Sequence, residues 1–355
     1  MKEKKMTALF VITGGVVGLL AVALTVFGNP ANMGVCVACF IRDTAGALGL
    51  HSAANVQYIR PEILGFIGGA FFLSLIRREF KPQGGSSPLL RFLISMFVII
   101  GALVFLGCPL RMLLRLAGGD LNALVGLAGF IAGIALGSLM LKKGFSLGRT
   151  QEQPVVSGLV MPALAAALLA FLLLRPAFIR FSESGPGSLH APVLIALAAG
   201  LIIGGFAQSS RMCMSGGFRD LILIKHSGLL VIYAVVFIAA LAGNLATGKF
   251  HAGFANQPIA HSDFLWNFLG MALAGYGSVL LGGCPLRQTI MAGEGNADAA
   301  ICVLGLVAGA ALSHNFGLAA SPQGVPLNGK IACVIGFGVI TCIALFNSGK
   351  NGARA

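Results

Sequence analysis

Charged residues are scarce in this 355-residue sequence, at 10% of the chain, whereas hydrophobic residues make up 57%. A soluble protein carries roughly 25% charged residues, so these charges are too few to cover a water-facing surface. The mean hydropathy of +0.92 points the same way. The shortage of charge excludes a set of soluble domains and predicts an all-α polytopic protein embedded in a lipid bilayer.

Several functional motifs are also missing from the sequence. It has no G-x-x-x-x-G-K-[ST] phosphate loop and no H-E-x-x-H zinc motif, which argues against an ATP-driven pump and a zinc protease. No basic stretch has interleaved aromatics, and the six histidines share no metal-like spacing. We therefore expect no catalytic site, no cofactor, no metal and no nucleic-acid partner.

Long apolar runs predict ten membrane-spanning helices, because one span needs about 20 apolar residues. These runs lie near 7–28, 61–76, 89–106, 121–141, 155–174, 190–207, 228–247, 264–282, 298–314 and 330–346. Four other segments are too short or too polar to span, and lie near 33–47, 108–117, 211–224 and 285–293. Cysteine, arginine and glycine occur in or beside each of these four, which makes them the candidates for function.

The basic residues predict how the chain is oriented. Lys and Arg outnumber Asp and Glu by 24 to 11, and they cluster at 2–5, 77–81, 142–149 and 350–354. By the positive-inside rule, both termini are expected in the cytoplasm, with the chain in the inner (plasma) membrane. The run after MKEKK is expected to remain as the first helix, because no small-residue cleavage site follows it.

An internal repeat divides the chain into halves. The pentapeptide GCPLR occurs at 107–111 and again at 283–287. A second pattern recurs at nearly the same spacing, namely Cys36 with Arg42-Asp43 and Cys213 with Arg219-Asp220. Five expected spans per half would insert the second copy upside down. The single transport domain 1–355 is thus predicted to contain two inverted-topology repeats, 1–177 and 178–355, each with two re-entrant half-helices.

Each GCPLR copy predicts a half-helix whose first turn attracts anions. Proline is favoured at the first helical position, which places Cys108 and Cys284 at the N-cap. Free backbone N–H groups at such an end favour an anion and also a thiolate. Arg111 and Arg287 add permanent charge nearby. Two such sites suit a small anion that is handled by sulfur.

The remaining cysteines allow more than one interpretation. Cys36 and Cys213 are expected to be equivalent thiols of the same path. Cys36 and Cys39 also form a C-x-x-C pair, which suits a redox disulfide. A membrane thiol oxidoreductase is therefore the alternative function, and a scaffold subunit is a third. The three cysteines inside apolar runs are expected to be small core residues: Cys302, Cys333 and Cys342.

Adjacent opposite charges are expected to form structural ion pairs that close the re-entrant segments. These charges are Arg42 with Asp43 and Arg219 with Asp220. Two acidic residues, Glu62 and Glu294, suit either proton carriage or anchoring at the membrane interface.

Four segments resemble the YeeE/YedE family of membrane transporters, and the likeness extends over essentially the whole chain. They are NPANMGVCVACFIRDTAGALGL (29–50), IGALVFLGCPLRMLLRLAGGDLNA (100–123), RMCMSGGFRDLIL (211–223) and LGGCPLRQTIMAGEGNAD (281–298). They look most like the YedE branch, which is described as transporting selenium. The better-understood members of the family take up thiosulfate through an hourglass-shaped inverted-repeat fold.

The resemblance implies a function and a path. Cys108 and Cys284 would line a narrow central route, with Cys36 or Cys39 adding a further thiol, and cysteines would pass the ion along by S–H···S hydrogen bonds. The implied substrate is thiosulfate or a related selenium species. A soluble TusA-like sulfur or selenium carrier is the implied cytoplasmic partner.

Overall fold

The computed structural model describes residues 2–349, and these are almost entirely helical. The long helices are α1 (Lys2–Val26), α3 (Pro61–Ile76), α4 (Pro88–Phe105), α6 (Asn122–Lys142), α7 (Val155–Leu174), α8 (Val193–Ser210), α10 (Gly228–Ala246), α11 (Phe264–Leu280), α13 (Ala297–Asn315) and α14 (Leu327–Phe346). The short helices are α2 (Val37–Ala47), α5 (Pro109–Ala117), α9 (Met214–Ile224) and α12 (Pro285–Gly293). Two-residue strands β1 (Gln83–Gly84) and β2 (Gln151–Glu152) pair antiparallel.

The helices confirm the predicted all-α membrane protein with many spans. In the part of the chain that is described, nine helices are long and apolar enough to cross a membrane. The helix α3 was expected to be a span but has only 16 residues, a rise of about 24 Å. It ends there because Arg77, Arg78 and Glu79 follow its apolar run directly.

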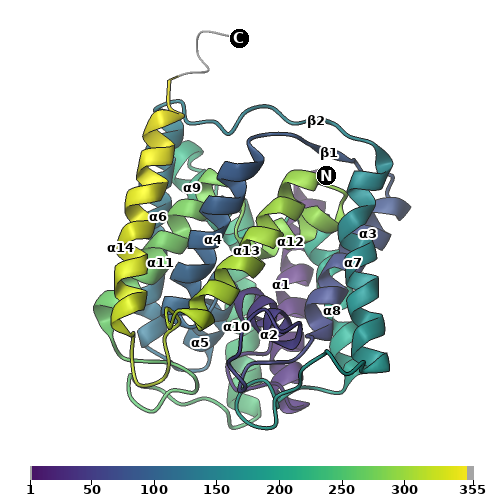
Figure 1. The fold of residues 1–355 in the computed structure, drawn as a ribbon, viewed down its shortest axis with the longest axis vertical. Helices are drawn as coiled ribbons and strands as arrows, with labels where there is room; N and C mark the ends of the chain where they lie inside the picture. Colours follow the sequence, from purple (N-terminus) through teal and green to yellow (C-terminus); the bar gives the residue numbers. More distant parts are fainter. Residues whose placement is uncertain (1, 350–355) are drawn as a thin grey trace.

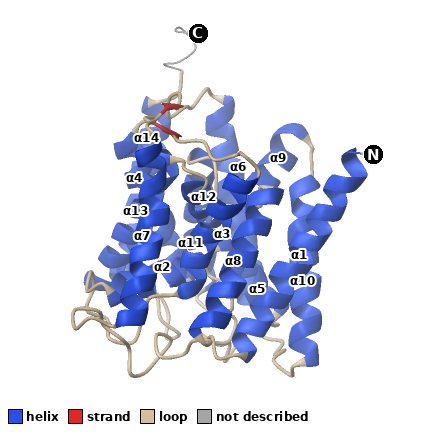
Figure 2. Cartoon of the chain, turned by 90° about the vertical axis from the view of Figure 1, so that its right-hand side faces the viewer, coloured by secondary structure: helices blue, strands red, loops and turns tan. Residues whose placement is uncertain are grey.

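Both ends of the described chain lie at the same end of the molecule (Figures 1 and 2). The start of α1, the paired strands β1 and β2, and the last turn of α14 all lie at the upper end in Figure 1. The basic clusters at 77–81 and 142–149 flank these strands in sequence. Lys350 and Arg354, which also entered the orientation argument, lie outside the described residues.

The four short helices are divided between the two ends of the molecule. In both views α2 and α5 lie in the lower half, whereas α9 and α12 lie in the upper half (Figures 1 and 2). Short and long helices follow one another in the same order in residues 2–174 and 193–346. The two stretches also pack across each other: α1 lies on α10 and α3 on α8, while α6 lies on α11 and α4 on α13.

Glycines allow the long helices to approach closely. A Cβ on Gly133 of α6 would overlap the carbonyl oxygen of Ala272 in α11. A Cβ on Gly69 of α3 would likewise overlap the carbonyl oxygen of Leu201 in α8. Small residues at such crossings increase van der Waals contact, which holds helices together in lipid. These close pairs fix the frame on which the short helices are held.

Candidate functional site

Two cysteines meet where the lower half-helices begin. Cys36 is the N-cap of α2, and its sulfur accepts a hydrogen bond from the backbone N–H of Cys39 at 3.3 Å. Cys108 is the N-cap of α5 and is followed by Pro109 at the first helical position, as the sequence predicted. The thiols of Cys36 and Cys108 interact with each other, and both residues are buried. We call Cys36 and Cys108 the lower thiol pair.

A second pair has the same construction at the upper half-helices. Cys213 is the N-cap of α9, and its sulfur accepts from the backbone N–H of Gly216 at 3.3 Å. Cys284 is the N-cap of α12, again followed by proline. The two thiols interact, and both residues are buried. We call Cys213 and Cys284 the upper thiol pair.

Backbone conformation matches closely between the two pairs. Cys36 and Cys213 have φ of −152° and −155°, whereas Cys108 and Cys284 have φ of −75° and −69°. Neither Cys108 nor Cys284 makes a full side-chain cap hydrogen bond, although each thiol lies near the backbone N–H of the arginine three residues on. The first-turn N–H groups of these half-helices point toward the thiols, and such groups attract anions and thiolates.

The glycine of each GCPLR copy lies beneath the arginine of the same copy. A Cβ on Gly107 would lie 2.9 Å from Cδ of Arg111, and a Cβ on Gly283 would lie 2.9 Å from Cγ of Arg287. Both arginines therefore fold back over the turn that precedes their half-helix. This contact explains why glycine precedes the cysteine in both motifs.

The arginine at the lower end is used mainly to hold the structure together. Arg111 is fully buried, and it donates to the carbonyl oxygens of Asn32 at 3.0 Å and Ile259 at 3.2 Å. One further N–H lies 3.2 Å from the sulfur of Cys39. Cys39 thus contacts Arg111 directly, while Cys36 belongs to the thiol pair.

The arginine at the upper end has an acidic partner instead. Arg287 donates to both carboxylate oxygens of Glu294, at 3.0 and 3.2 Å, and Arg211 donates to the same carboxylate at 3.0 Å. A cavity of about 350 Å³ lies beside this cluster. It is lined by Glu79, Lys81, Gln83, Arg211, Glu294 and Asn296. Glu294 therefore balances two positive charges at the edge of a polar cavity.

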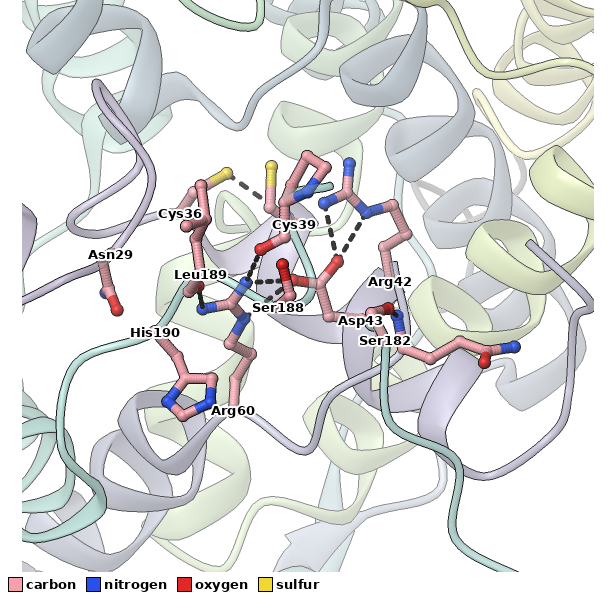
Figure 3. A network of polar contacts seen from close by, with 12 residues as sticks. Asn29, Cys36, Cys39, Arg42, Asp43, Arg60, Ser182, Ser188, Leu189 and His190 are labelled. Atoms are coloured by element: carbon pink, nitrogen blue, oxygen red, sulfur yellow. Dashed lines mark hydrogen bonds and ion pairs between the residues drawn. The ribbon is translucent and has the colours of Figure 1, made fainter. Parts of the chain in front are cut away.

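The predicted charge pairs form, but they differ in their surroundings. Figure 3 shows Arg42 and Arg60 both directed at the Asp43 carboxylate, which they reach at 2.6 and 2.7 Å. All three side chains are buried. The second pair, Arg219 with Asp220 at 2.7 Å, is partly exposed, with 29% and 24% of the side chains accessible.

Sequence reasoning missed two buried arginines. Arg60 joins the Asp43 cluster from the loop before α3 and also donates to the carbonyl oxygens of Pro186 and Leu189. Arg115 pairs with Asp120 at 2.6 Å, and both side chains are fully buried. A charge inside or beside an apolar run is the signal that could have found both residues.

The other cysteines only partly follow the prediction. Cys302 and Cys333 are buried, as expected. Cys342 was expected in the core but is exposed, because α14 lies at the outside of the bundle. All eight cysteines are free thiols. Within residues 2–349, no group of three or more His, Cys, Asp and Glu side chains could hold a metal ion.

Among the described residues, nine helices are long and apolar enough to cross a membrane, which defines a multi-pass helical membrane protein. Four buried cysteines lie at the starts of its short, interrupted helices. The sulphur transport family model matches residues 209–346. The matched residues contain two of the four motifs, 211–223 and 281–298.

One curated relative is the thiosulfate transporter TsuA of Escherichia coli (strain K12). It is 29% identical to this chain over 107 residues. The alignment covers 30% of this chain and 30% of the relative. The chain thus matches less than a third of the length of that protein.

Proposed function

We propose that this protein imports a small reduced sulfur anion, thiosulfate or a selenium counterpart, across the inner membrane. The observation that carries the proposal is the placement of two thiol pairs at the N-termini of half-helices from opposite ends of the molecule. The family match and the thiosulfate-transporting relative support the sulfur substrate.

Thiols at helix N-termini suit a soft anion chemically. Each S–H is a weak hydrogen-bond donor, so an anion that moves from one thiol to the next loses little binding free energy at each step. Binding that is favourable but loose is what conduction requires. The partial positive charge of the half-helix ends compensates the anion in a buried, low-dielectric place. A cysteine relay from Cys36 and Cys108 to Cys213 and Cys284 follows.

The repeats proposed for this path are 1–177 and 178–355, in inverted orientation. Three observations support them: the shared order of elements, the matching N-cap dihedral angles, and the reciprocal packing of α1 on α10 and α8 on α3. Ion transporters with such repeats bind substrate between the halves, where interrupted helices end.

The arginines have different roles under this proposal. Arg111 fixes the lower turn through backbone carbonyls, and Arg287 supplies positive charge near the upper thiol pair. The Arg42–Asp43 and Arg219–Asp220 pairs are structural. The upper end, with the basic clusters, is the cytoplasmic side, so both termini are cytoplasmic. A TusA-like carrier would accept the cargo there.

The test is uptake by a transport-deficient, sulfur-requiring cell that carries this chain. We expect thiosulfate-supported growth, and a loss of roughly ten-fold or more in initial uptake for Cys108→Ala and Cys284→Ala, because each removes a donor to a charged ligand. Cys333→Ala, a buried cysteine of α14 outside both pairs, is the matched control and should retain uptake.

Other outcomes point to different functions. If labelled selenium enters the cells and thiosulfate does not support their growth, the substrate is a selenium species. The thiol oxidoreductase alternative predicts instead that Cys39→Ser inactivates the protein, and that a Cys36–Cys39 disulfide turns over with an electron partner. Unchanged uptake in both Ala variants would contradict the relay.

A further inference from the structure

One buried tyrosine lies between the two thiol pairs. Tyr233 is in the second turn of α10, and only 4% of its surface is exposed. The helix α10 packs against α5 and against α9. The half-helix α5 begins at Cys108, and α9 begins at Cys213. Tyr233 thus comes from a helix that contacts a half-helix from each end of the molecule.

Tyr233 lies within electrostatic range of sulfur from both pairs. It interacts electrostatically with Cys284 and Cys213 of the upper pair, with Cys108 of the lower pair, and with Arg287. These residues come from both ends of the bundle, so the hydroxyl lies between the lower thiol pair and the upper thiol pair.

This hydroxyl also lacks a hydrogen-bond partner among the described residues. A buried hydroxyl without a partner costs about 1–3 kcal/mol. Buried polar groups are otherwise almost always paired. Phenylalanine would fill the same space without that cost. The hydroxyls of Tyr58 and Tyr276 are also without such a partner. What sets Tyr233 apart is that its unpaired hydroxyl lies near four groups of the proposed path.

The other two tyrosines of the chain have different surroundings. Tyr58 stacks on His190 at 4.1 Å and lies under the guanidinium of Arg60. Tyr276 of α11 stacks on Phe337 of α14 at 6.5 Å. Neither has a thiol among its electrostatic neighbours. Tyr233 is distinguished by the sulfur around it.

We infer that the Tyr233 hydroxyl donates a hydrogen bond to the transported anion as it passes from the lower to the upper thiol pair. A neutral O–H donor suits this point, because a second fixed cation would hold the anion too tightly to release it. The inference rests on the proposed function and adds a substrate-binding group to it. It also places the central binding site at Tyr233, Cys108, Cys213 and Cys284.

The experiment compares Tyr233→Phe with Tyr276→Phe and wild type, as purified protein in proteoliposomes with labelled thiosulfate. We expect Tyr233→Phe to lower uptake at subsaturating thiosulfate roughly ten-fold, mainly through KM, since a hydrogen bond to a charged ligand is lost. Tyr276→Phe, which also removes one phenolic oxygen from a buried tyrosine, should transport like wild type.

A second readout separates substrate binding from a structural role. Without substrate, Tyr233→Phe should melt at the wild-type temperature or above it, because an unpaired hydroxyl has been removed. The rise in melting temperature that thiosulfate gives to wild type should be reduced in this variant. Tyr233→Phe that melts lower, with uptake reduced only in proportion to folded protein, would overturn the inference.

The failures of the two proposals are distinguishable. If wild type transports and Tyr233→Phe transports equally well, the tyrosine inference is wrong and the relay stands. If wild type neither transports thiosulfate nor is stabilised by it, the proposed function is wrong and the inference falls with it.

Discussion

Replacing Arg60 with methionine would leave Asp43 buried with only one of its two arginines. Arg60 is fully buried, and its guanidinium also donates to the carbonyl oxygens of Pro186 at 2.7 Å and Leu189 at 3.0 Å. Methionine has a similar length and keeps the packing beneath Phe40, so the change removes charge and donors rather than volume.

The magnitude follows from the burial of the cluster. Removing one partner of a buried ion pair costs about 3–5 kcal/mol, because a desolvated charge is left uncompensated. Arg42 still contacts Asp43, which places the loss at the lower end of that range. At about 2–4 °C per kcal/mol for a large domain, the melting temperature should fall by roughly 10 °C.

The assay is thermal unfolding of the detergent-solubilised protein, followed by the loss of the monodisperse peak in size-exclusion chromatography. Arg219→Met is the control, since it removes an arginine from the second-half counterpart of Arg42–Asp43, where the side chains are partly exposed. Exposed pairs contribute about 0–1 kcal/mol, so this variant should shift the melting temperature little. Equal shifts for Arg60→Met and Arg219→Met would refute the argument from burial.

Two further predictions concern packing and pH. Gly133→Ala should destabilise the protein by about 1–3 kcal/mol or more in the same assay, since a Cβ at this position meets backbone. Gly338→Ala is the control and should not destabilise it, because a Cβ there meets nothing within 4 Å. Equal melting temperatures for the two variants would contradict this prediction. Burial lowers the pKa of His261, a loop residue that bonds the carbonyl of Val104 at 2.8 Å. The stability that the neutral, buried imidazole contributes is present above the ordinary pKa of about 6.5 and is lost as pH falls below that value. His261→Gln should therefore weaken this pH dependence of the melting temperature.

The interrupted helices could be predicted from sequence because their signals are local. Cys-Pro in each GCPLR copy fixes where α5 and α12 begin, and the structure starts both helices at that proline. The apolar runs located the long helices to within several residues. Among the described helices, α3 falls short of the length of a candidate span, because the charged residues from Arg77 onward end its run.

Contacts between distant segments could not be predicted in the same way. Nothing local indicates that Arg60 would reach Asp43, or that Tyr233 of α10 would come within electrostatic range of Cys108, Cys213 and Cys284. Each depends on how the helices cross, which single residues do not reveal. The exposure of Cys342 depends in the same way on the outer position of α14.

The most direct test of the cysteine relay is uptake of labelled thiosulfate by proteoliposomes that contain only this protein. Wild type should accumulate label above protein-free vesicles, and Cys108→Ala and Cys284→Ala should each fall to that background when reconstituted in equal amounts. Cys333→Ala should match wild type. Uptake by both Ala variants at the wild-type rate, from folded protein, would contradict passage of the anion along the two thiol pairs.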